Sequence, residues 1–105
     1  MMFESVNFKS GKVRFCSGCM DDEDILRVKF PENYILDLGW YGNSNGFIIY
    51  IIRDMEWAVP VVEYQFFDDK LAETALCLAV GRIEKEAACS KPYYGALWET
   101  EKIVL

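Results

Sequence analysis

The sequence contains no histidine, and this absence excludes several classes of enzyme. Histidine is the commonest general base, the commonest metal ligand and the usual partner that activates a serine or cysteine nucleophile. A catalytic set of the Ser-His-Asp or Cys-His kind therefore cannot be built from this chain. Because no other catalytic motif is present, we expect that the protein is not an enzyme and carries no cofactor.

Basic residues are scarce as well: there are 11 Lys and Arg against 17 Asp and Glu, and the formal net charge is −6. Binding to a phosphate backbone needs clustered Lys and Arg, so we expect no nucleic-acid partner. The acidic balance suits a basic protein partner, because opposite fields speed encounter. A charge of this size also keeps any small domain soluble, so it does not by itself identify a partner.

Long apolar runs are missing too. None reaches the roughly 18 residues that a membrane helix needs, so we expect no membrane association. The opening MMFESVNFKSGK lacks the basic stretch and apolar core of a signal peptide, which favours a cytoplasmic location. Because 105 residues with 52% hydrophobic content suffice for one core, residues 1–105 are predicted to form a single domain. We expect a monomer or a weak homodimer.

Only four cysteines occur, and two of them, Cys16 and Cys19, enclose the motif CSGC. A redox Cys-x-x-Cys opens a helix, whose N-terminus lowers the thiol pKa, whereas this motif follows a strand-like run and precedes four acidic residues. A zinc site would need two further ligands, and Cys77 and Cys89 are too far apart for the usual spacing, so we expect no metal site. Both are predicted to be small, partly buried packing residues. A small redox or metal-binding protein that uses Cys16 and Cys19 is the alternative to the function developed below.

The stretch YILDLGWYGNSNGFIIYIIRDMEWAVPVVEYQFFDD, residues 34–69, organises the chain. It holds three apolar runs, at residues 34–41, 47–52 and 57–66, separated by two polar turns, which predicts a three-stranded meander. The second run is apolar at every position, so this strand should be central and covered on both faces. Pro60 cannot donate a ladder hydrogen bond, so the third run is an edge strand, starts late or carries a bulge.

A helix is predicted over residues 68–87. Asp68 can cap its free amide groups, and apolar residues recur at helical spacing on one face. These residues are Ala72, Leu76, Ala79, Val80, Ile83 and Ala87. Charged residues lie mostly on the other face, so the helix should cover one face of the sheet.

Shorter runs at residues 3–8, 12–16, 25–30 and 93–105 supply further strand candidates. The sum is about six or seven strands and one long helix, and strands joined by short turns pair antiparallel. The predicted fold class is therefore α+β. We expect a mainly antiparallel, twisted sheet, which can curl into a half-barrel, with the helix packed on it.

Acidic residues gather in two of the predicted turns. The first turn holds Asp21, Asp22, Glu23 and Asp24, and the second holds Asp54 and Glu56. The first run lacks the alternating D-x-D-x-D-G pattern of a calcium loop, so a solvated turn is a simpler interpretation than a metal site. Docking surfaces for a basic partner are more credible, because turns project carboxylates from the rim of a sheet.

Two aromatic residues beside these turns are candidate anchors for a partner. Trp and Tyr are enriched at interface hot spots, although in a small sheet protein an aromatic side chain more often belongs to the core. Trp40 shares a face with Leu36 and Leu38 and is assigned to the core. Tyr41, beside the Gly-Asn loop, and Trp57, beside the second acidic turn, are predicted to lie at the surface.

The segment ILDLGWYGNSNGFIIYIIRDMEWAVPVVEYQFFDDKLAETALCLAVGRIEK resembles a pattern found in small bacterial immunity proteins. Those proteins neutralise toxins of contact-dependent growth inhibition and related polymorphic toxin systems. The resemblance covers about half of the chain, as an ordered set of elements. These are a strand ending in Gly39-Trp40-Tyr41, a Gly/Asn loop at residues 42–46, an apolar strand at residues 47–52, the turn Asp54-Met55-Glu56-Trp57, a strand at residues 59–66 and a helix at residues 68–87.

The resemblance implies a protein that acts by binding and has no catalytic residues. Its partner would be the C-terminal domain of a cognate toxin, whose active site or substrate surface it would cover. Many such toxins are nucleases with basic active sites, which an acidic inhibitor can match in charge. The expected partner-binding residues are then Asp21, Asp22, Glu23, Asp24, Tyr41, Asp54, Glu56 and Trp57.

Overall fold

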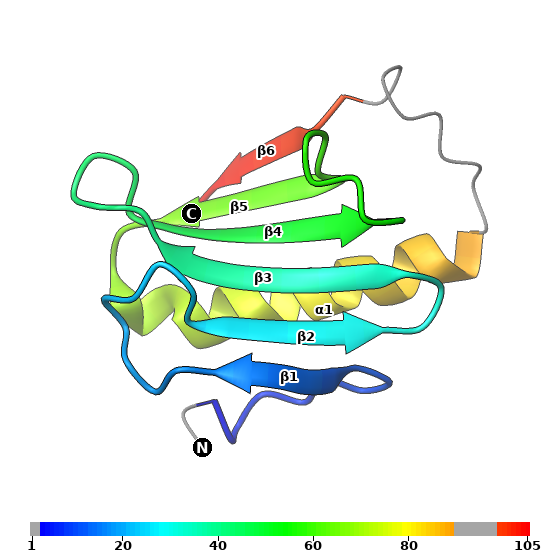
Figure 1. Ribbon diagram of the computed structural model, residues 1–105, viewed down its shortest axis with the longest axis horizontal. Coiled ribbons are helices and arrows are strands. Elements are labelled where there is room, and N and C mark those ends of the chain that lie inside the picture. Colours follow the sequence, from blue (N-terminus) through cyan, green and yellow to red (C-terminus); the bar gives the residue numbers. More distant parts are fainter. Residues whose placement is uncertain (1–2, 90–98) are drawn as a thin grey trace.

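The fold is one α-helix packed on a six-stranded sheet (Figure 1). The computed structural model describes residues 3–89 and 99–105. Its strands are β1 (Lys12–Cys16), β2 (Leu26–Phe30), β3 (Tyr34–Trp40), β4 (Phe47–Arg53), β5 (Val62–Phe66) and β6 (Glu101–Val104). A short 3₁₀ turn, η1 (Asp69–Leu71), leads into the helix α1 (Ala72–Cys89).

The strands lie in the sheet in the order in which they occur in the chain. Neighbouring strands are antiparallel, except that β6 runs parallel to β5. A parallel neighbour needs a crossover connection, and α1 lies between these two strands in the sequence. The α+β fold with a mainly antiparallel sheet and one long helix is confirmed. The sheet stays open, with β1 and β6 at its edges, and does not close into a barrel.

The turns have the backbone conformations that their sequences favour. Gly42 and Gly46 have φ of +87° and +68°, and the Gly46 amide donates to the Gly42 carbonyl at 2.7 Å. Between β4 and β5, Asp54 and Met55 have φ of +54° and +62°. Such left-handed residues match the twist of a tight hairpin connection. The turn therefore carries the Asp54 side chain to the rim of the sheet, where it is exposed.

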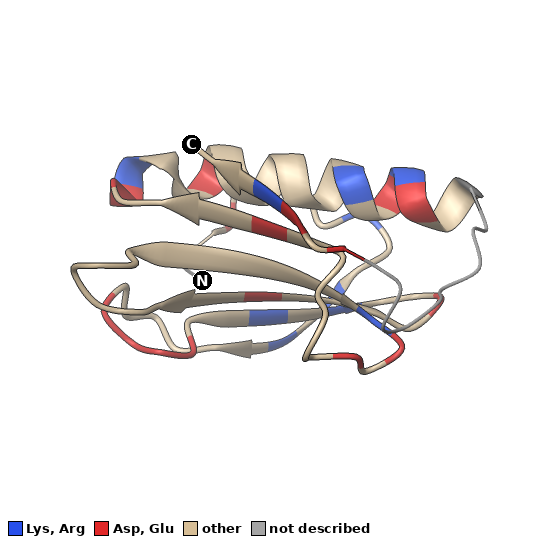
Figure 2. Cartoon of the chain, turned by 90° about the horizontal axis from the view of Figure 1, so that it is seen from above, with Lys and Arg blue, Asp and Glu red and all other residues tan. Residues whose placement is uncertain are grey.

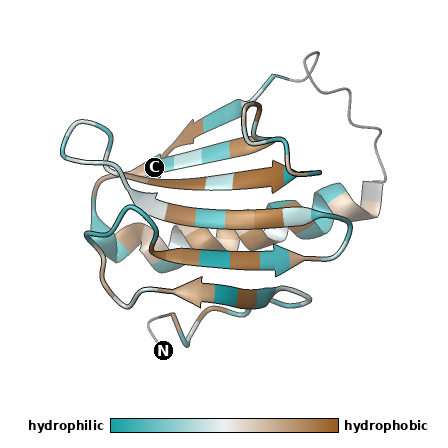
Figure 3. Cartoon of the chain, in the orientation of Figure 1, coloured by the Kyte–Doolittle hydropathy of each residue, from teal (hydrophilic) through white to brown (hydrophobic). Residues whose placement is uncertain are grey.

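Strand β4 is the fourth of the six strands and is covered on both faces, as its continuous apolar sequence predicts. Figure 3 shows it as apolar along nearly its whole length, whereas β2 and β3 alternate. Ile49 and Ile51 belong to the core on the α1 side. Ile48 and Ile52 point to the other face and are still buried. We call that second face, which α1 does not cover, the open face.

Helix α1 covers its side of the sheet with the predicted apolar stripe. Leu76, Val80 and Ile83 are buried in one core with side chains of β2 to β5. Burying each such side chain contributes about 1.5–3 kcal/mol relative to exposure. Asp68 is the predicted cap, since its carboxylate accepts a hydrogen bond from the Lys70 amide at 3.0 Å. No helix in the described part of the chain is both long enough and apolar enough to cross a membrane.

The structure contradicts one predicted strand and decides between the alternatives that were open for another. Residues 3–8 do not form a strand: local bonds from the Val6 amide to the Phe3 carbonyl and from the Gly11 amide to the Phe8 carbonyl make turns. Their apolar side chains are nevertheless buried in the core. The alternating hydrophobic pattern of this segment therefore results from core packing and not from pairing with another strand. The third apolar run is a strand only from Val62, which fits a late start after Pro60.

Two further sets of predictions concern the cysteines of α1 and the end of the chain. Cys77 is exposed on α1, so its assignment as a partly buried packing residue is wrong; the helix turns it away from the sheet. The matching prediction for the Cys89 side chain lies outside the described residues. Of the strands predicted within residues 93–105, β6 is present, and residues 93–98 lie outside the described part.

Candidate functional site on the open face of the sheet

A row of polar and aromatic side chains crosses the open face from edge to edge. The strand register places one residue from each strand in this row, in the order Phe15, Arg27, Asp37, Tyr50, Glu63 and Lys102. Side chains at directly opposed positions of neighbouring strands lie within reach of one another. The row therefore joins two cationic and two anionic groups on a face that is otherwise apolar near its centre.

Asp37, in the middle of β3, is the buried charged residue of this row, with only 5% of its surface exposed. The Arg27 guanidinium Nη2 lies 3.2 Å from the Asp37 Oδ2 and donates a hydrogen bond to it. Burial raises the pKa of the Asp37 carboxyl; Arg27 opposes the rise and the charge of Asp24 adds to it. The chain thus keeps a partly desolvated carboxylate at the centre of a sheet, where apolar residues would be more stable.

Arg27 is held on its other side by Trp57. The Cζ atom of Arg27 lies 5.1 Å from the centre of the Trp57 ring, which is a cation–π contact. Trp57 belongs to the loop between β4 and β5, whereas Arg27 belongs to β2. The loop therefore folds back across the open face, and this explains why Ile52 beneath it is fully buried.

Two tyrosines extend the site beside Asp37. The rings of Tyr41 and Tyr50 meet edge to face, with centres 6.0 Å apart. Burial raises the pKa of Tyr41 to about 12, and the charge of Asp37 adds to this rise. Burial also raises the pKa of Tyr50. Like any tyrosine phenol, both are protonated at neutral pH, and the O–H groups can donate hydrogen bonds.

Two cavities open among these side chains. The first, of about 250 Å³, is lined by Phe15, Asp24, Arg27 and Asp37. The second, of about 370 Å³, lies under the β4–β5 loop and is lined by Tyr50, Ile52, Trp57, Ala58, Pro60 and Glu63. Arg27 of the first cavity contacts Trp57 of the second, so the two cavities adjoin along the row.

The two acidic turns lie at opposite ends of the open face. Figure 2 shows both as red loops on the side of the sheet away from α1, one near the start of β2 and the other after β4. The Trp40 amide donates to the Asp22 carbonyl at 2.9 Å, which ties the first turn to the end of β3. Gly39 permits this contact, because a Cβ there would lie 1.9 Å from the Glu23 carbonyl oxygen.

The structure brings some of the predicted partner-binding residues together and separates others. Asp24, Tyr41 and Trp57 all lie near Asp37 on the open face. Asp21, Asp22 and Glu23 are exposed in the first turn, and Asp21 lines a cavity together with Asp68 and Asp69 beside the start of α1. In the second turn Asp54 is exposed and Glu56 is half-buried. The carboxylate of Asp54 is also occupied in part, because Arg53 Nε lies 3.5 Å from its Oδ2.

Sequence reasoning missed Asp37, Arg27 and Phe15 as site residues. Alternation placed Asp37 on the face opposite Leu36, but this gave no reason to choose it as functional. The available signal was a single carboxylate inside the apolar run YILDLGW. Phe15 gave no such signal, because its 47% exposure follows from the irregular pairing between Val13 and Phe15 in β1.

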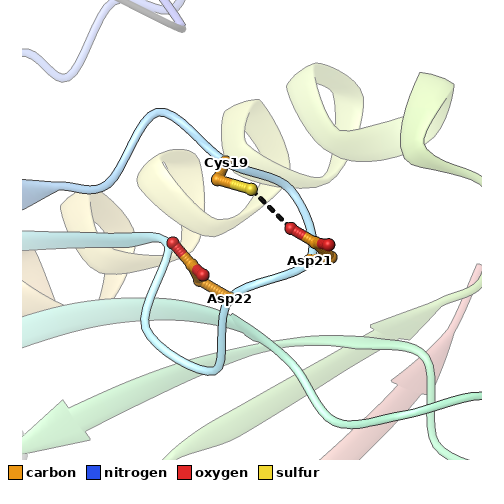
Figure 4. A group of neighbouring side chains, drawn as sticks. All are labelled: Cys19, Asp21 and Asp22. Carbon is orange, nitrogen blue, oxygen red and sulfur yellow. Dashed lines mark hydrogen bonds between the residues drawn. The ribbon is translucent and has the colours of Figure 1, made fainter.

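A second cluster, in the loop between β1 and β2, contains Cys19, Asp21 and Asp22 (Figure 4). Their ligating atoms lie within 4.8 Å of one another, and all three residues are exposed. The Cys19 thiol donates a hydrogen bond to the Asp21 carboxylate. This bond is the main cause that raises the pKa of Cys19, and the charges of Asp21 and Asp22 add to the rise. A thiol held protonated is a poor nucleophile, which counts against the redox alternative.

In comparisons with known proteins, no family model, no curated protein and no solved structure matches this chain.

Proposed function

We propose that the chain is a cytoplasmic immunity protein that binds the C-terminal domain of a cognate bacterial toxin and blocks its activity. The observation that carries this proposal is the open face, which is framed at both ends by acidic turns and crossed by aromatic and polar side chains. The toxin would belong to a contact-dependent growth inhibition or related polymorphic toxin system, and its active domain would be a nuclease.

Charge supports this proposal. A nuclease active site carries basic residues that hold phosphate, and the chain offers a net charge of −6 with four adjacent acids in one turn. Opposite potentials raise association rates from about 10⁵–10⁶ M⁻¹s⁻¹ toward 10⁸ M⁻¹s⁻¹ or more at low salt. Fast capture suits an inhibitor, because a toxin must be bound before it reaches its substrate.

Aromatic anchors and size also support the proposal. Phe15 and Trp57 remain 47% and 39% exposed on the open face, although large apolar side chains gain free energy when they are buried. Partly exposed aromatic side chains of this kind are frequent anchors of interfaces. The molecule measures 35 Å by 29 Å across its broad side, which accommodates the roughly 800 Å² per partner of a standard interface.

The proposed function predicts that a toxin domain is encoded immediately upstream of this gene, and absence of a toxic domain there would count against it. Cells that express the toxin domain should stop growing, and co-expression of this chain should restore growth. The purified chain should bind the purified toxin domain in a one-to-one complex and abolish its nuclease activity. A toxin domain from an unrelated system serves as the control and should be neither bound nor inhibited. If the upstream domain is toxic and this chain neither binds it nor protects the cells, the proposal is wrong.

A further inference from the structure

We infer that the cavity beside Asp37 is a subsite for one arginine side chain of the protein partner. This inference rests on the proposed function, since it names the group of the toxin domain that enters the open face. The cavity is lined by Phe15, Asp24, Arg27 and Asp37, and it brings two carboxylates and one aromatic ring together. A guanidinium is the protein group that matches both, because it donates to carboxylates and stacks on aromatic rings.

The Asp37 carboxylate has unused capacity to accept hydrogen bonds. An ionised carboxylate offers about four lone-pair sites on its two oxygens. Among residues 3–89 and 99–105, its one hydrogen-bond donor is Arg27 Nη2, which contacts Oδ2. The second oxygen, Oδ1, receives no donor from these residues. A carboxylate that is 95% buried, with a donor on only one of its two oxygens, is costly to maintain unless another donor arrives.

Charge and space agree with a single cationic occupant. The two carboxylates and Arg27 sum to one negative charge, which one guanidinium would neutralise. The cavity volume of about 250 Å³ is several times the roughly 30 Å³ share of a water molecule, so it holds a side-chain head group. The half-exposed ring of Phe15 gives that group a stacking surface.

Asp37 differs from the carboxylates of the acidic turns in what it contributes to binding. Carboxylates that stay exposed at a rim are screened by solvent and salt, and they act mainly on the association rate. A buried carboxylate that gains a charged partner acts on the dissociation rate. We therefore assign Asp37 to retention of the partner and Asp21, Asp22 and Glu23 to its encounter.

The subsite can be tested on the full chain with a short peptide, N-acetyl-Gly-Arg-Gly-amide. Matched peptides carry citrulline, which has nearly the shape of arginine without the charge, or lysine. The arginine peptide should shift the carbon NMR signal of the Asp37 carboxyl and the ring signals of Phe15, and the citrulline peptide should not. The lysine peptide should bind more weakly, because an ammonium group cannot form the planar paired contact. Equal shifts from the arginine and citrulline peptides, or none from either, would overturn the assignment.

Variants locate the effect within the row. Asp37→Asn and Phe15→Ala should each remove the response to the arginine peptide. Glu63→Gln is the matched control, because it removes a carboxylate from the same row two strands away from Asp37 and outside the cavity. An amide spectrum of each variant checks that it is folded. Unchanged binding of the peptide by folded Asp37→Asn would contradict the subsite.

Binding to the toxin domain separates the subsite from the proposed function. If both hold, Asp37→Asn should weaken the complex by about 30-fold or more, mainly through faster dissociation. If the wild-type chain and Asp37→Asn bind the toxin domain equally well, the subsite is wrong and the proposed function stands. If the wild-type chain binds the arginine peptide through Asp37 but has no affinity for the toxin domain, the proposed function is wrong and the subsite stands.

Discussion

At the scale of single residues, the protein places its most exceptional side chain in the middle of β3. Asp37 is surrounded by Arg27 of β2, Tyr50 of β4, Tyr41 after β3 and Asp24 of the first acidic turn. Only Arg27 among these groups favours the ionised carboxylate by charge and hydrogen bonding, and burial outweighs it. The residue therefore reduces the stability of the folded chain at neutral pH, which is typical of groups kept for function.

The pKa of Asp37 predicts how stability depends on pH. A raised pKa means that the folded chain holds this proton more tightly than the unfolded chain does. The protonated carboxyl therefore stabilises the folded chain fully below the ordinary pKa of 3.8, and this stabilisation is lost as pH rises through the raised pKa. Asp37→Asn removes this dependence, and Arg27, whose side chain is 44% exposed, can turn to water. At neutral pH we expect the free energy of unfolding of the variant to equal that of the wild type or to exceed it by up to about 1 kcal/mol.

Urea unfolding of both chains across a pH series measures this effect. The difference between wild type and variant should change in favour of the variant as pH rises above 3.8. A variant that is less stable than the wild type by about 3 kcal/mol or more at neutral pH would instead identify Asp37 as a structural anchor.

The residues of the site were predictable only where exposure could be inferred from turn chemistry. Tyr41 and Trp57 stand next to recognisable turns, so the sequence predicted them at the surface; Trp57 is exposed there and Tyr41 is half-buried. Asp37 lies inside a strand, and its significance arises from Phe15 and Trp57, which come from distant parts of the chain. Alternation assigns a side chain to a face, but it says nothing about what the opposite strands and loops build above that face.

At the scale of elements, the first acidic turn is fixed to the sheet by close backbone contacts. The Ile25 amide donates to the Leu38 carbonyl, and the Trp40 amide donates to the Asp22 carbonyl, each at 2.9 Å. These bonds pass over Gly39, where there is no room for a side chain. The turn is therefore held in one position, which would lower the entropic cost of binding the proposed partner.

A pair of glycine variants tests this arrangement. Gly39→Ala would place a methyl group 1.9 Å from the Glu23 carbonyl oxygen, and we expect a loss of about 1–3 kcal/mol of stability as the turn is displaced. Gly81→Ala is the control, because a Cβ added at this position of α1 would meet nothing within 4 Å, and it should stabilise the helix by roughly 1 kcal/mol. Urea unfolding gives both values, and amide exchange at Trp40 reports the turn. Full stability and unchanged exchange in Gly39→Ala would show that the turn does not lie against β3.

The elements themselves were largely predictable, and the exceptions have a common cause. Period-two alternation gave β1 and β2, the apolar run gave β4, and the capped amphipathic stretch gave α1. Residues 3–8 carry a strand-like pattern but bury their apolar side chains from turns, so no pairing partner is needed. Residues 57–61 also have an apolar, strand-like sequence but do not belong to β5. Trp57 instead crosses the open face to reach Arg27. The local sequence indicates that these apolar side chains pack against the protein, and contacts with the rest of the chain determine whether they do so from a strand or from a turn.

At the scale of the whole molecule, the two faces of the sheet are covered to different extents. One face is closed by α1 and forms the core, which uses the apolar stripe of the helix in full. The other face is closed only in part, by the β4–β5 loop, and keeps aromatic side chains, a buried carboxylate and two cavities in reach of a partner. The acidic turns border this face at two ends (Figure 2), and the strand register also places Lys12, Arg27 and Lys29 on it. A basic protein surface is the complement that we propose for it.

Association kinetics with the upstream toxin domain test this central claim most directly. One variant carries Asp54→Asn with Glu56→Gln in the second acidic turn, and a second carries Asn or Gln at Asp21, Asp22 and Glu23, which leaves Asp24 of the subsite unchanged. The control carries Glu73→Gln with Glu84→Gln on α1, and so removes the same number of charges, two, as the first variant. Both acidic-turn variants should associate more slowly, by about tenfold for the larger change at low salt, and with a weaker salt dependence. The α1 control should associate nearly as the wild type does. If all four chains associate at the same rate at low and at moderate salt, the acidic turns do not steer the toxin to the open face and the account is contradicted.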